Sequence, residues 1–380
     1  MVPGAAEMLL KKARSSFEKH SYEDTLKHCK DAIAIVDKEM SGPTAARMRA
    51  DILLLMADAK DISGAWIDAI LYLDGVSQIS LGLGDHKLAV ESLIRAGYTM
   101  SKKGKWADAK KKFDKAESIS SKHGNHRLLG RALVGQGIVL WRLGNYLEAI
   151  HHGERAADMG KKARDDELIG RAASLISNVR FDRGEYEASL AANRDALASF
   201  EKVKDDLEIA RLFNNSGETY KVMGDYKRAI ELFDNCVKVA ERSGNKRTLG
   251  YAMTNLAEST ARLGDTAKAV KYAAKADEAF QGMEDKYALA NLAMVWGLIH
   301  SVSGKHEEAD ESFVKAQTMM TELGIPYDTG VINLEHGRVQ AKRGDSAGAK
   351  MSLKAAIHSF AEAGAAGMRE KAEKELASLG

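Results

Sequence analysis

Three arginines recur at a fixed interval and form the clearest chemistry-bearing set in the sequence. Arg131, Arg171 and Arg211 follow one another at steps of 40 residues. A guanidinium group pairs with a carboxylate through two parallel hydrogen bonds. The set therefore indicates a surface for acidic groups, provided that the fold brings the three positions to one wall.

Motifs for phosphate, zinc and redox chemistry are missing. The sequence has no GxxxxGK[ST] loop, no HExxH and no paired CxxC. His123 with His126, and His151 with His152, have no carboxylate or thiol fixed beside them, so we expect no metal site. We predict that the chain is not an enzyme and uses no cofactor.

A lysine-rich stretch offers a different chemistry. Residues 102–115 hold seven lysines around Trp106 and Phe113, a pattern that could grip a nucleic-acid backbone and stack on its bases. Both aromatic residues also fall at apolar positions of the repeat described below. We therefore favour a helix with core aromatics and lysines on its exposed faces.

Composition limits the class of protein further. The chain has 56 Lys+Arg against 54 Asp+Glu, a net charge of +2, and so no global field that would capture nucleic acid or a membrane. Its 3 prolines suit an almost wholly helical protein. The N-terminus lacks the features of a secretory signal, and no apolar run reaches the ~18 residues of a spanning helix. We expect a cytoplasmic protein with reduced, packed Cys29 and Cys236.

A repeat of 40 residues must position the arginines. Its clearest copy spans residues 213–246 and has the spacing that two packed antiparallel helices need, with these residues in order: Gly217, Tyr220, the turn Gly224-Asp225-Tyr226, Ala229, Phe233 and Cys236. The turn glycine recurs at Gly64, Gly104, Gly144, Gly184, Gly224, Gly264, Gly304 and Gly344.

The repeat predicts a single domain over residues 1–380. Residues 5–40 form a divergent first unit with His20 in place of the turn glycine, residues 45–361 form eight regular units, and residues 365–379 form a solvated capping helix. The step from His20 to Gly64 is 44 residues, and it includes Ser41-Gly42-Pro43. This is the one irregular joint.

Local chemistry explains the turn within each unit. Gly144 can adopt the left-handed conformation that ends the first helix. Asn145, with Glu148 three residues later, has the form of a capping box that opens the second helix. Small residues such as Gly217 on the first helix face small residues such as Ala229 on the second, which lets the two helices approach closely.

This combination resembles the tetratricopeptide repeat family over essentially the whole chain. The family's usual step is about 34 residues, and a step of 40 resembles its longer-helix branch. The resemblance implies an all-α fold: an α-solenoid that winds into a right-handed superhelix of about nine helical hairpins plus a C-terminal capping helix. It also implies a concave groove lined by the first helices.

The resemblance places groove residues six and three before the small residue of the first helix, and one, four and five after it. Large apolar rings would then point into the groove at Trp141 and Phe181, and the amides of Asn215 and Asn255 could reach a bound backbone. The candidate peptide-binding residues are Arg131, Val134, Ile138, Trp141, Arg142, Arg171, Ser174, Asn178, Phe181, Arg211, Asn214, Asn215, Lys221 and Asn255.

We therefore predict a protein-interaction scaffold that binds a peptide segment with acidic and apolar side chains in its groove. The alternative is a regulatory module that senses a ligand or peptide. Nucleic-acid binding through the lysine-rich outer face is a third, disfavoured reading. The expected partner is an acidic protein or peptide, no membrane contact is expected, and self-association is left open.

Overall fold

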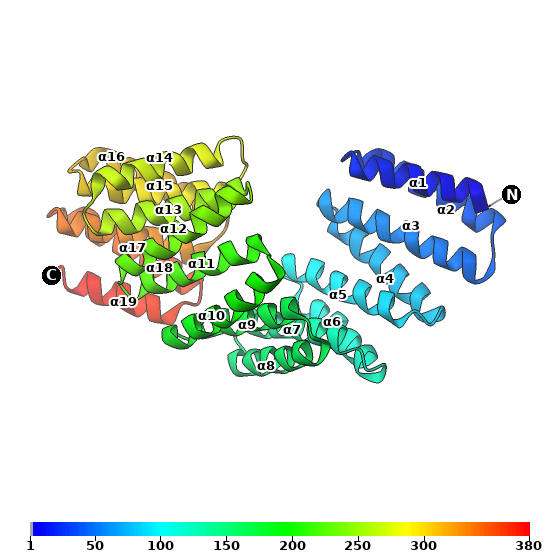
Figure 1. The fold of residues 1–380 in the computed structure, drawn as a ribbon. Coiled ribbons are helices and arrows are strands. Elements are labelled where there is room, and N and C mark those ends of the chain that lie inside the picture. Colours follow the sequence, from blue (N-terminus) through cyan, green and yellow to red (C-terminus); the bar gives the residue numbers. More distant parts are fainter. Residues whose placement is uncertain (1–2) are drawn as a thin grey trace. The chain divides into compact units, whose positions relative to one another are not determined.

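The computed structural model describes residues 3–380, and every regular element in that range is a helix (Figure 1). Nineteen helices form nine hairpins and one terminal helix, as the 40-residue period predicts. Backbone contacts divide the chain into two compact units. Unit 1 comprises the described residues up to Val203, and unit 2 comprises Lys204–Gly380.

Unit 1 contains five hairpins. Their first helices are α1 (Pro3–Glu18), α3 (Gly42–Ile62), α5 (His86–Lys102), α7 (His126–Arg142) and α9 (Asp166–Asp182). Their second helices are α2 (Tyr22–Glu39), α4 (Trp66–Gly82), α6 (Trp106–Lys122), α8 (Tyr146–Ala163) and α10 (Tyr186–Val203).

Unit 2 contains four hairpins and the terminal helix. The first helices are α11 (Asp206–Val222), α13 (Lys246–Arg262), α15 (Lys286–Val302) and α17 (Pro326–Lys342). The second helices are α12 (Tyr226–Arg242), α14 (Thr266–Phe280), α16 (His306–Glu322) and α18 (Ser346–Glu362), and α19 (Ala366–Ala377) closes the unit.

Within each unit, helices that are consecutive in sequence pack side by side, and the first helices of neighbouring hairpins also contact one another (Figure 1). This pattern is an α-solenoid, in which each hairpin buries its apolar face against its neighbours. We call the surface formed by the first helices of one unit its first-helix face.

The turns are built largely as their residues predict. Gly144 has a φ of +80° and ends α7 in the left-handed conformation. Arg164 and Lys204 adopt the same conformation, with φ of 54° and 57°, although they are not glycines. The Asp165 carboxylate accepts a hydrogen bond from the Leu168 backbone N–H and caps α9.

The expected capping box at Asn145 is wrong. The Asn145 side chain makes no cap hydrogen bond to α8. Unlike the partly buried cap residues Asp165 and Asp225, Asn145 is exposed, so water can satisfy the first N–H groups of the helix.

Phenylalanine side chains fill the space opposite the small residues. A Cβ atom on Gly217 would lie 2.5 Å from the Phe233 ring, and one on Gly170 would lie 2.8 Å from Phe200. Both rings are fully buried. The close helix approach is therefore a contact of glycine with an aromatic ring, in addition to the small pairs such as Ser177 and Ser189, whose hydroxyl groups lie 3.0 Å apart.

The two cysteines and the terminal helix behave as predicted. Cys29 and Cys236 are buried free thiols, and burial raises the pKa of each to about 12. Helix α19 packs on α18 and buries Ala372 in a cluster with Leu353 and Phe360. Its other residues are mostly exposed, as expected of a cap.

Candidate peptide-binding surface

Two of the three periodic arginines belong to unit 1, on the neighbouring first helices α7 and α9. Burial raises the pKa of Tyr98 on α5, and the charges of Arg171 and Arg131 both act to lower it. Arg131 is half-buried and Arg171 is exposed. Arg171 Nε also donates a hydrogen bond to Glu167 Oε1 at 2.9 Å. The first-helix face of unit 1 therefore carries adjacent positive charge over α7 and α9.

The predicted rings on this face are half-buried rather than fully exposed. Trp141 packs against the cluster that contains Leu140 and Leu175, and its Nε1 donates a hydrogen bond to Asp182 Oδ2 at 2.7 Å. The exposed guanidinium of Arg142 lies 4.3 Å from the Trp141 ring centroid.

Phe181 lies 5.8 Å from the Tyr186 ring, between centroids. The ring of Phe181 thus leans toward the second helix of its own hairpin and keeps one part exposed. Trp141 and Phe181 therefore each expose only part of their aromatic ring.

The remaining unit 1 candidates differ in accessibility. Val134 is only 4% exposed and packs with Leu133 in the core, so it has no surface to offer a peptide. Ile138 is half-buried between two core clusters. Ser174 and Asn178 are half-buried, and the Ser174 hydroxyl donates to the Gly170 carbonyl oxygen at 2.9 Å.

In unit 2, the third periodic arginine is exposed and has a local partner. Arg211 Nη1 lies 3.0 Å from Glu208 Oε1, and its side chain is 59% exposed. The Asn255 amide nitrogen donates to Asn214 Oδ1 at 3.0 Å and so joins α13 to α11. Asn215 is half-buried on α11.

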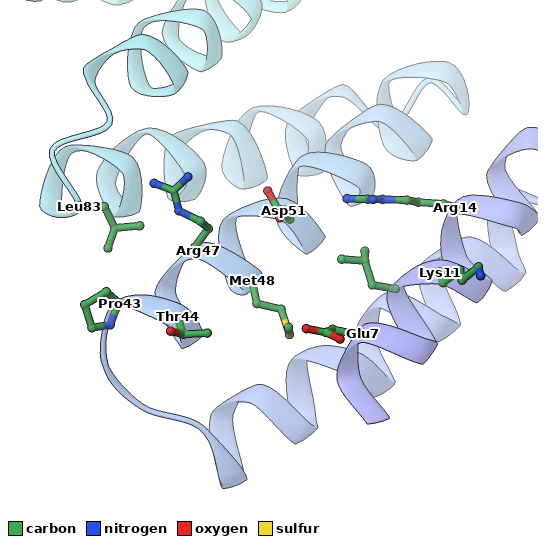
Figure 2. Close-up of a pocket in the computed structure, with 10 residues that line it drawn as sticks. Glu7, Lys11, Arg14, Pro43, Thr44, Arg47, Met48, Asp51 and Leu83 are labelled. Carbon is green, nitrogen blue, oxygen red and sulfur yellow. The ribbon is translucent and has the colours of Figure 1, made fainter. Parts of the chain in front are cut away.

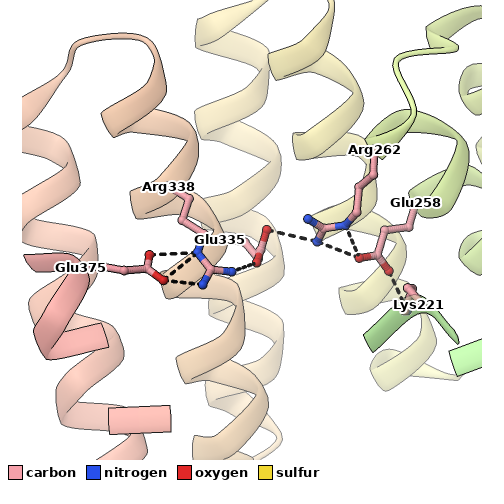
Figure 3. Close-up of polar contacts among 6 residues, drawn as sticks. All are labelled: Lys221, Glu258, Arg262, Glu335, Arg338 and Glu375. Carbon is pink, nitrogen blue, oxygen red and sulfur yellow. Dashed lines mark hydrogen bonds and ion pairs between the residues drawn. The ribbon is translucent and has the colours of Figure 1, made fainter. Parts of the chain in front are cut away.

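Lys221 lies in a chain of ion pairs that crosses the first-helix face of unit 2 (Figure 3). Its ammonium group lies 2.8 Å from Glu258 and 2.9 Å from Glu218, and it donates to Asn255 Oδ1 at 3.2 Å. The side chain is only 16% exposed. The Lys221 ammonium group is therefore already paired with side chains of this protein.

The contacts continue from Glu258 across the unit. Arg262 Nη2 lies 2.8 Å from Glu258 and 3.1 Å from Glu335, and Arg338 pairs with both Glu335 and Glu375 (Figure 3). We call this set the ion-pair chain, and its members are Lys221, Glu258, Arg262, Glu335, Arg338 and Glu375.

The ion-pair chain links α11, α13, α17 and α19 without α15. One repeat away from Glu258 and Glu335, α15 carries the buried apolar residues Leu298 and Val295. The bond from Arg262 to Glu335 therefore joins first helices two hairpins apart. Internal charges thus occupy much of this face.

Glu258 and Lys221 of the ion-pair chain are largely buried, so each stays ionised only because its oppositely charged neighbours stabilise the charge. Burial alone would raise the pKa of Glu258, but the Lys221 ammonium and the Arg262 guanidinium lower it to about 2. Burial alone would lower the pKa of Lys221, but Glu218 and Glu258 raise it above its usual range. Glu258, Lys221 and Arg262 are therefore all held in their charged forms.

The lysine-rich stretch has local acidic partners. Lys112 pairs with Asp74 at 2.6 Å, Lys110 with Asp114 at 2.9 Å and Lys111 with Asp108 at 3.0 Å. Phe113 is fully buried and Trp106 is half-buried. The ring of Phe113, which base stacking would need, is therefore part of the core.

One pattern that resembles a nucleophile elbow, GxSxG, occurs at residues 344–348. An elbow needs a turn between a strand and a helix, whereas here the turn joins α17 to α18. The Asp345 carboxylate caps α18 by accepting from the Gly348 N–H at 2.9 Å. Among the described residues, no histidine is hydrogen-bonded to the Ser346 side chain.

Sequence reasoning missed most of the ion-pair chain, although one signal was present. Glu258 directly follows the small residue Ala257, at the position that the repeat spacing assigns to the groove. The approach of Arg262 to Glu335 has no such signal, because it depends on how three successive hairpins turn.

Comparisons with known proteins agree with this geometry. A family profile described as tetratricopeptide repeat matches residues 128–202 and 208–281. The apo form of RapI is 14% identical, with a TM-score of 0.69, over 94% of this chain and 98% of its own. The apo quorum sensor NprR from B. thuringiensis is 14% identical, with a TM-score of 0.64, over 95% of this chain and 100% of its own.

A third solved structure is the Rap conjugation gene regulator of the plasmid pLS20 in complex with the Phr* peptide. It is 14% identical, with a TM-score of 0.59, over 99% of this chain and 98% of its own. Identities this low show the fold alone. No curated protein matches the sequence.

The fold and its repeated hairpins define a helical repeat protein of the α-solenoid class. Residues 128–202 and 208–281 match the tetratricopeptide repeat family, and the chain has the helical-repeat fold of the similar solved structures. Within residues 3–380, none of the helices combines the length and the apolar character needed to cross a membrane.

Proposed function

We propose that the chain is a protein-interaction scaffold that binds a peptide segment with acidic and apolar side chains on the first-helix face of unit 1. The observation that carries this proposal is that Arg131 and Arg171, one repeat apart on the neighbouring first helices α7 and α9, both act on the pKa of the Tyr98 phenol. Guanidinium groups suit carboxylates, and the partly exposed rings of Trp141 and Phe181 suit apolar side chains. Tryptophan and arginine are also the residues that dominate the energy of many interfaces.

Unit 2 supports the same choice by contrast. A peptide over α13 and α17 would have to displace the internal ion pairs of Arg262 and Glu335. Breaking a buried pair costs more than an exposed contact returns. The proposed site is therefore confined to unit 1, with α7 and α9 at its centre.

Similar structures add support for a peptide ligand. One is a Rap regulator in complex with the Phr* peptide, and another is called a quorum sensor. A third carries the name aspartyl phosphate phosphatase F from Bacillus subtilis. We favour a scaffold without catalysis, because both thiols are buried and, in the described part of the chain, the Ser346 hydroxyl has no histidine partner. We place it in the cytoplasm, where free thiols stay reduced.

A sensor module is the second candidate, favoured by the names of the similar structures. One of them is a signal transduction ATPase with a tetratricopeptide repeat sensor. A sensor would change its conformation when the peptide binds, whereas a scaffold would not. Small-angle scattering with and without peptide separates the two: a changed radius of gyration supports the sensor.

The test of binding uses a matched pair of variants. A random peptide library displayed on phage is selected against the protein, and the dissociation constants of enriched peptides are measured by fluorescence polarisation. Arg171→Ala removes a half-exposed cation that pairs with Glu167 at i,i+4. The control, Lys110→Ala, removes a cation of nearly the same exposure, 45% against 44%, that pairs with Asp114 at i,i+4 on α6.

We expect enriched peptides to contain acidic and apolar residues. Arg171→Ala should weaken their binding by about tenfold or more, which corresponds to about 1.4 kcal/mol, and Lys110→Ala should leave it unchanged. Loss of binding in the control with full binding in Arg171→Ala would place the site on the second helices and overturn the proposal.

A further inference from the structure

A cavity of about 740 Å³ opens between α1 and α3 in unit 1, beside Leu83 at the end of α4 (Figure 2). Its volume lies within the range of about 300–1,000 Å³ that is usual for small-molecule sites. Pro43 and Thr44 line one edge. The irregular joint that precedes α3 therefore borders this space, and no regular hairpin step has such a joint.

The cavity has an apolar floor. Leu10 and Met48 are 7% and 8% exposed and belong to the core cluster of the first two hairpins. Leu10 lines the cavity from α1 and Met48 lines it from α3. The apolar side chain of a ligand could contact the small surface that these two residues leave exposed.

Charged groups of both signs surround the floor. Glu7, Lys11 and Arg14 line the cavity from α1, and Arg47 and Asp51 line it from α3 (Figure 2). Burial raises the pKa of Asp51, while Arg14 and Arg47 act to lower it.

Most of these charges lack a close partner. Among residues 3–380, Glu7 and Lys11 make no hydrogen bond or ion pair. Arg14 interacts with Asp51 only through space, and Arg47 has a single long ion pair, 3.7 Å, to Asp85. A concave site with charges of both signs, of which Glu7 and Lys11 have no close partner among the described residues, suits a ligand that itself carries both signs.

We propose that this cavity binds a small zwitterion with an apolar side chain, its ammonium group at Glu7, its carboxylate at Arg14 and Arg47, and its side chain on Leu10 and Met48. Two sources share this chemistry, a free apolar amino acid and a very short free peptide. The site is separate from the face over α7 and α9, so neither proposal depends on the other.

The test uses isothermal titration calorimetry with four probes: L-leucine, tri-leucine, N-acetyl-tri-leucine and tri-leucine amide. We expect tri-leucine or leucine to bind, and each blocked form of tri-leucine to bind at least tenfold more weakly than the free form if the peptide is the source. Tighter binding of tri-leucine identifies a short peptide, and equal or tighter binding of leucine identifies an amino acid.

Variants connect each end of the ligand to its residue. Glu7→Gln should weaken the free peptide about tenfold and leave the N-acetyl form unchanged, and Arg14→Gln should weaken the free peptide and leave the amide unchanged. Matched controls on α1 are Glu18→Gln and Lys12→Gln, which are exposed and lie outside the cavity. The proposal fails if no probe binds at millimolar concentration, if blocked and free forms bind equally, or if the controls weaken binding as much as the cavity variants.

Discussion

The ion-pair chain of unit 2 makes a quantitative prediction for Glu258. Its pKa is about 2 in the folded protein and about 4.3 in an unfolded chain. A difference of about 2.3 pKa units corresponds to about 3 kcal/mol of stability at neutral pH, since each unit is worth about 1.4 kcal/mol. Because the Glu258 side chain is only 8% exposed, little of this is screened by solvent.

Glu258→Gln keeps the shape and removes the charge that Lys221 and Arg262 face. We expect it to lower the free energy of unfolding of unit 2 by about 3 kcal/mol at pH 7, or somewhat less where Glu218 and Glu335 compensate. The folded-state pKa lies below the unfolded value. The stability that the ionised Glu258 contributes to the wild-type protein is therefore complete above about pH 4.3 and is lost as the pH falls toward about 2.

Urea denaturation followed by circular dichroism measures the total effect, and hydrogen exchange with mass spectrometry localises it to α11, α13 and α17. The matched control is Glu241→Gln on α12, an exposed glutamate with no side-chain partner among the described residues. An effect of Glu258→Gln below about 0.5 kcal/mol, the usual size for a surface change, would falsify the stabilising role of the ion-pair chain. The same conclusion would follow if the difference in free energy of unfolding between the wild type and Glu258→Gln did not become smaller between pH 5 and pH 2.

Three further predictions concern the repeat itself. Gly217→Ala should cost about 1–3 kcal/mol in urea denaturation, because its Cβ would lie 2.5 Å from the Phe233 ring; an unchanged midpoint would show that the helices can separate there at no cost. Arg164→Gly should raise the thermal midpoint by relieving a left-handed conformation worth about 1 kcal/mol, and a lowered midpoint would contradict this reasoning. A chain ended at Gly364 lacks α19 and exposes the apolar cluster beneath it, so light scattering should detect association; a monodisperse, equally stable product would contradict the capping role.

The hairpins could be predicted from sequence because their determinants are local. The turn at Gly144 and the cap at Asp165 lie within a few residues of the helix ends they define. Asn145 shows the limit of such reasoning, since the same residue type leaves its cap unmade when its side chain is solvated.

The candidate surface could be predicted only in part. Periodicity predicts Arg131 and Arg171 on one wall, and the charges of both act on the pKa of Tyr98. It could not predict that Lys221 is held by Glu258, or that Arg262 reaches Glu335, 73 residues away. Contacts of that kind depend on the packing of several hairpins and have no local sequence signature.

The most direct test of peptide binding on the first-helix face of unit 1 is photo-cross-linking. A library-selected peptide carrying a benzophenone side chain is bound to the full-length protein and irradiated, and the cross-linked residues are mapped by mass spectrometry. We predict cross-links within α7 and α9, between Arg131 and Arg142 and between Arg171 and Asp182. Cross-links confined to the second helices α6 and α8 would contradict the proposed surface.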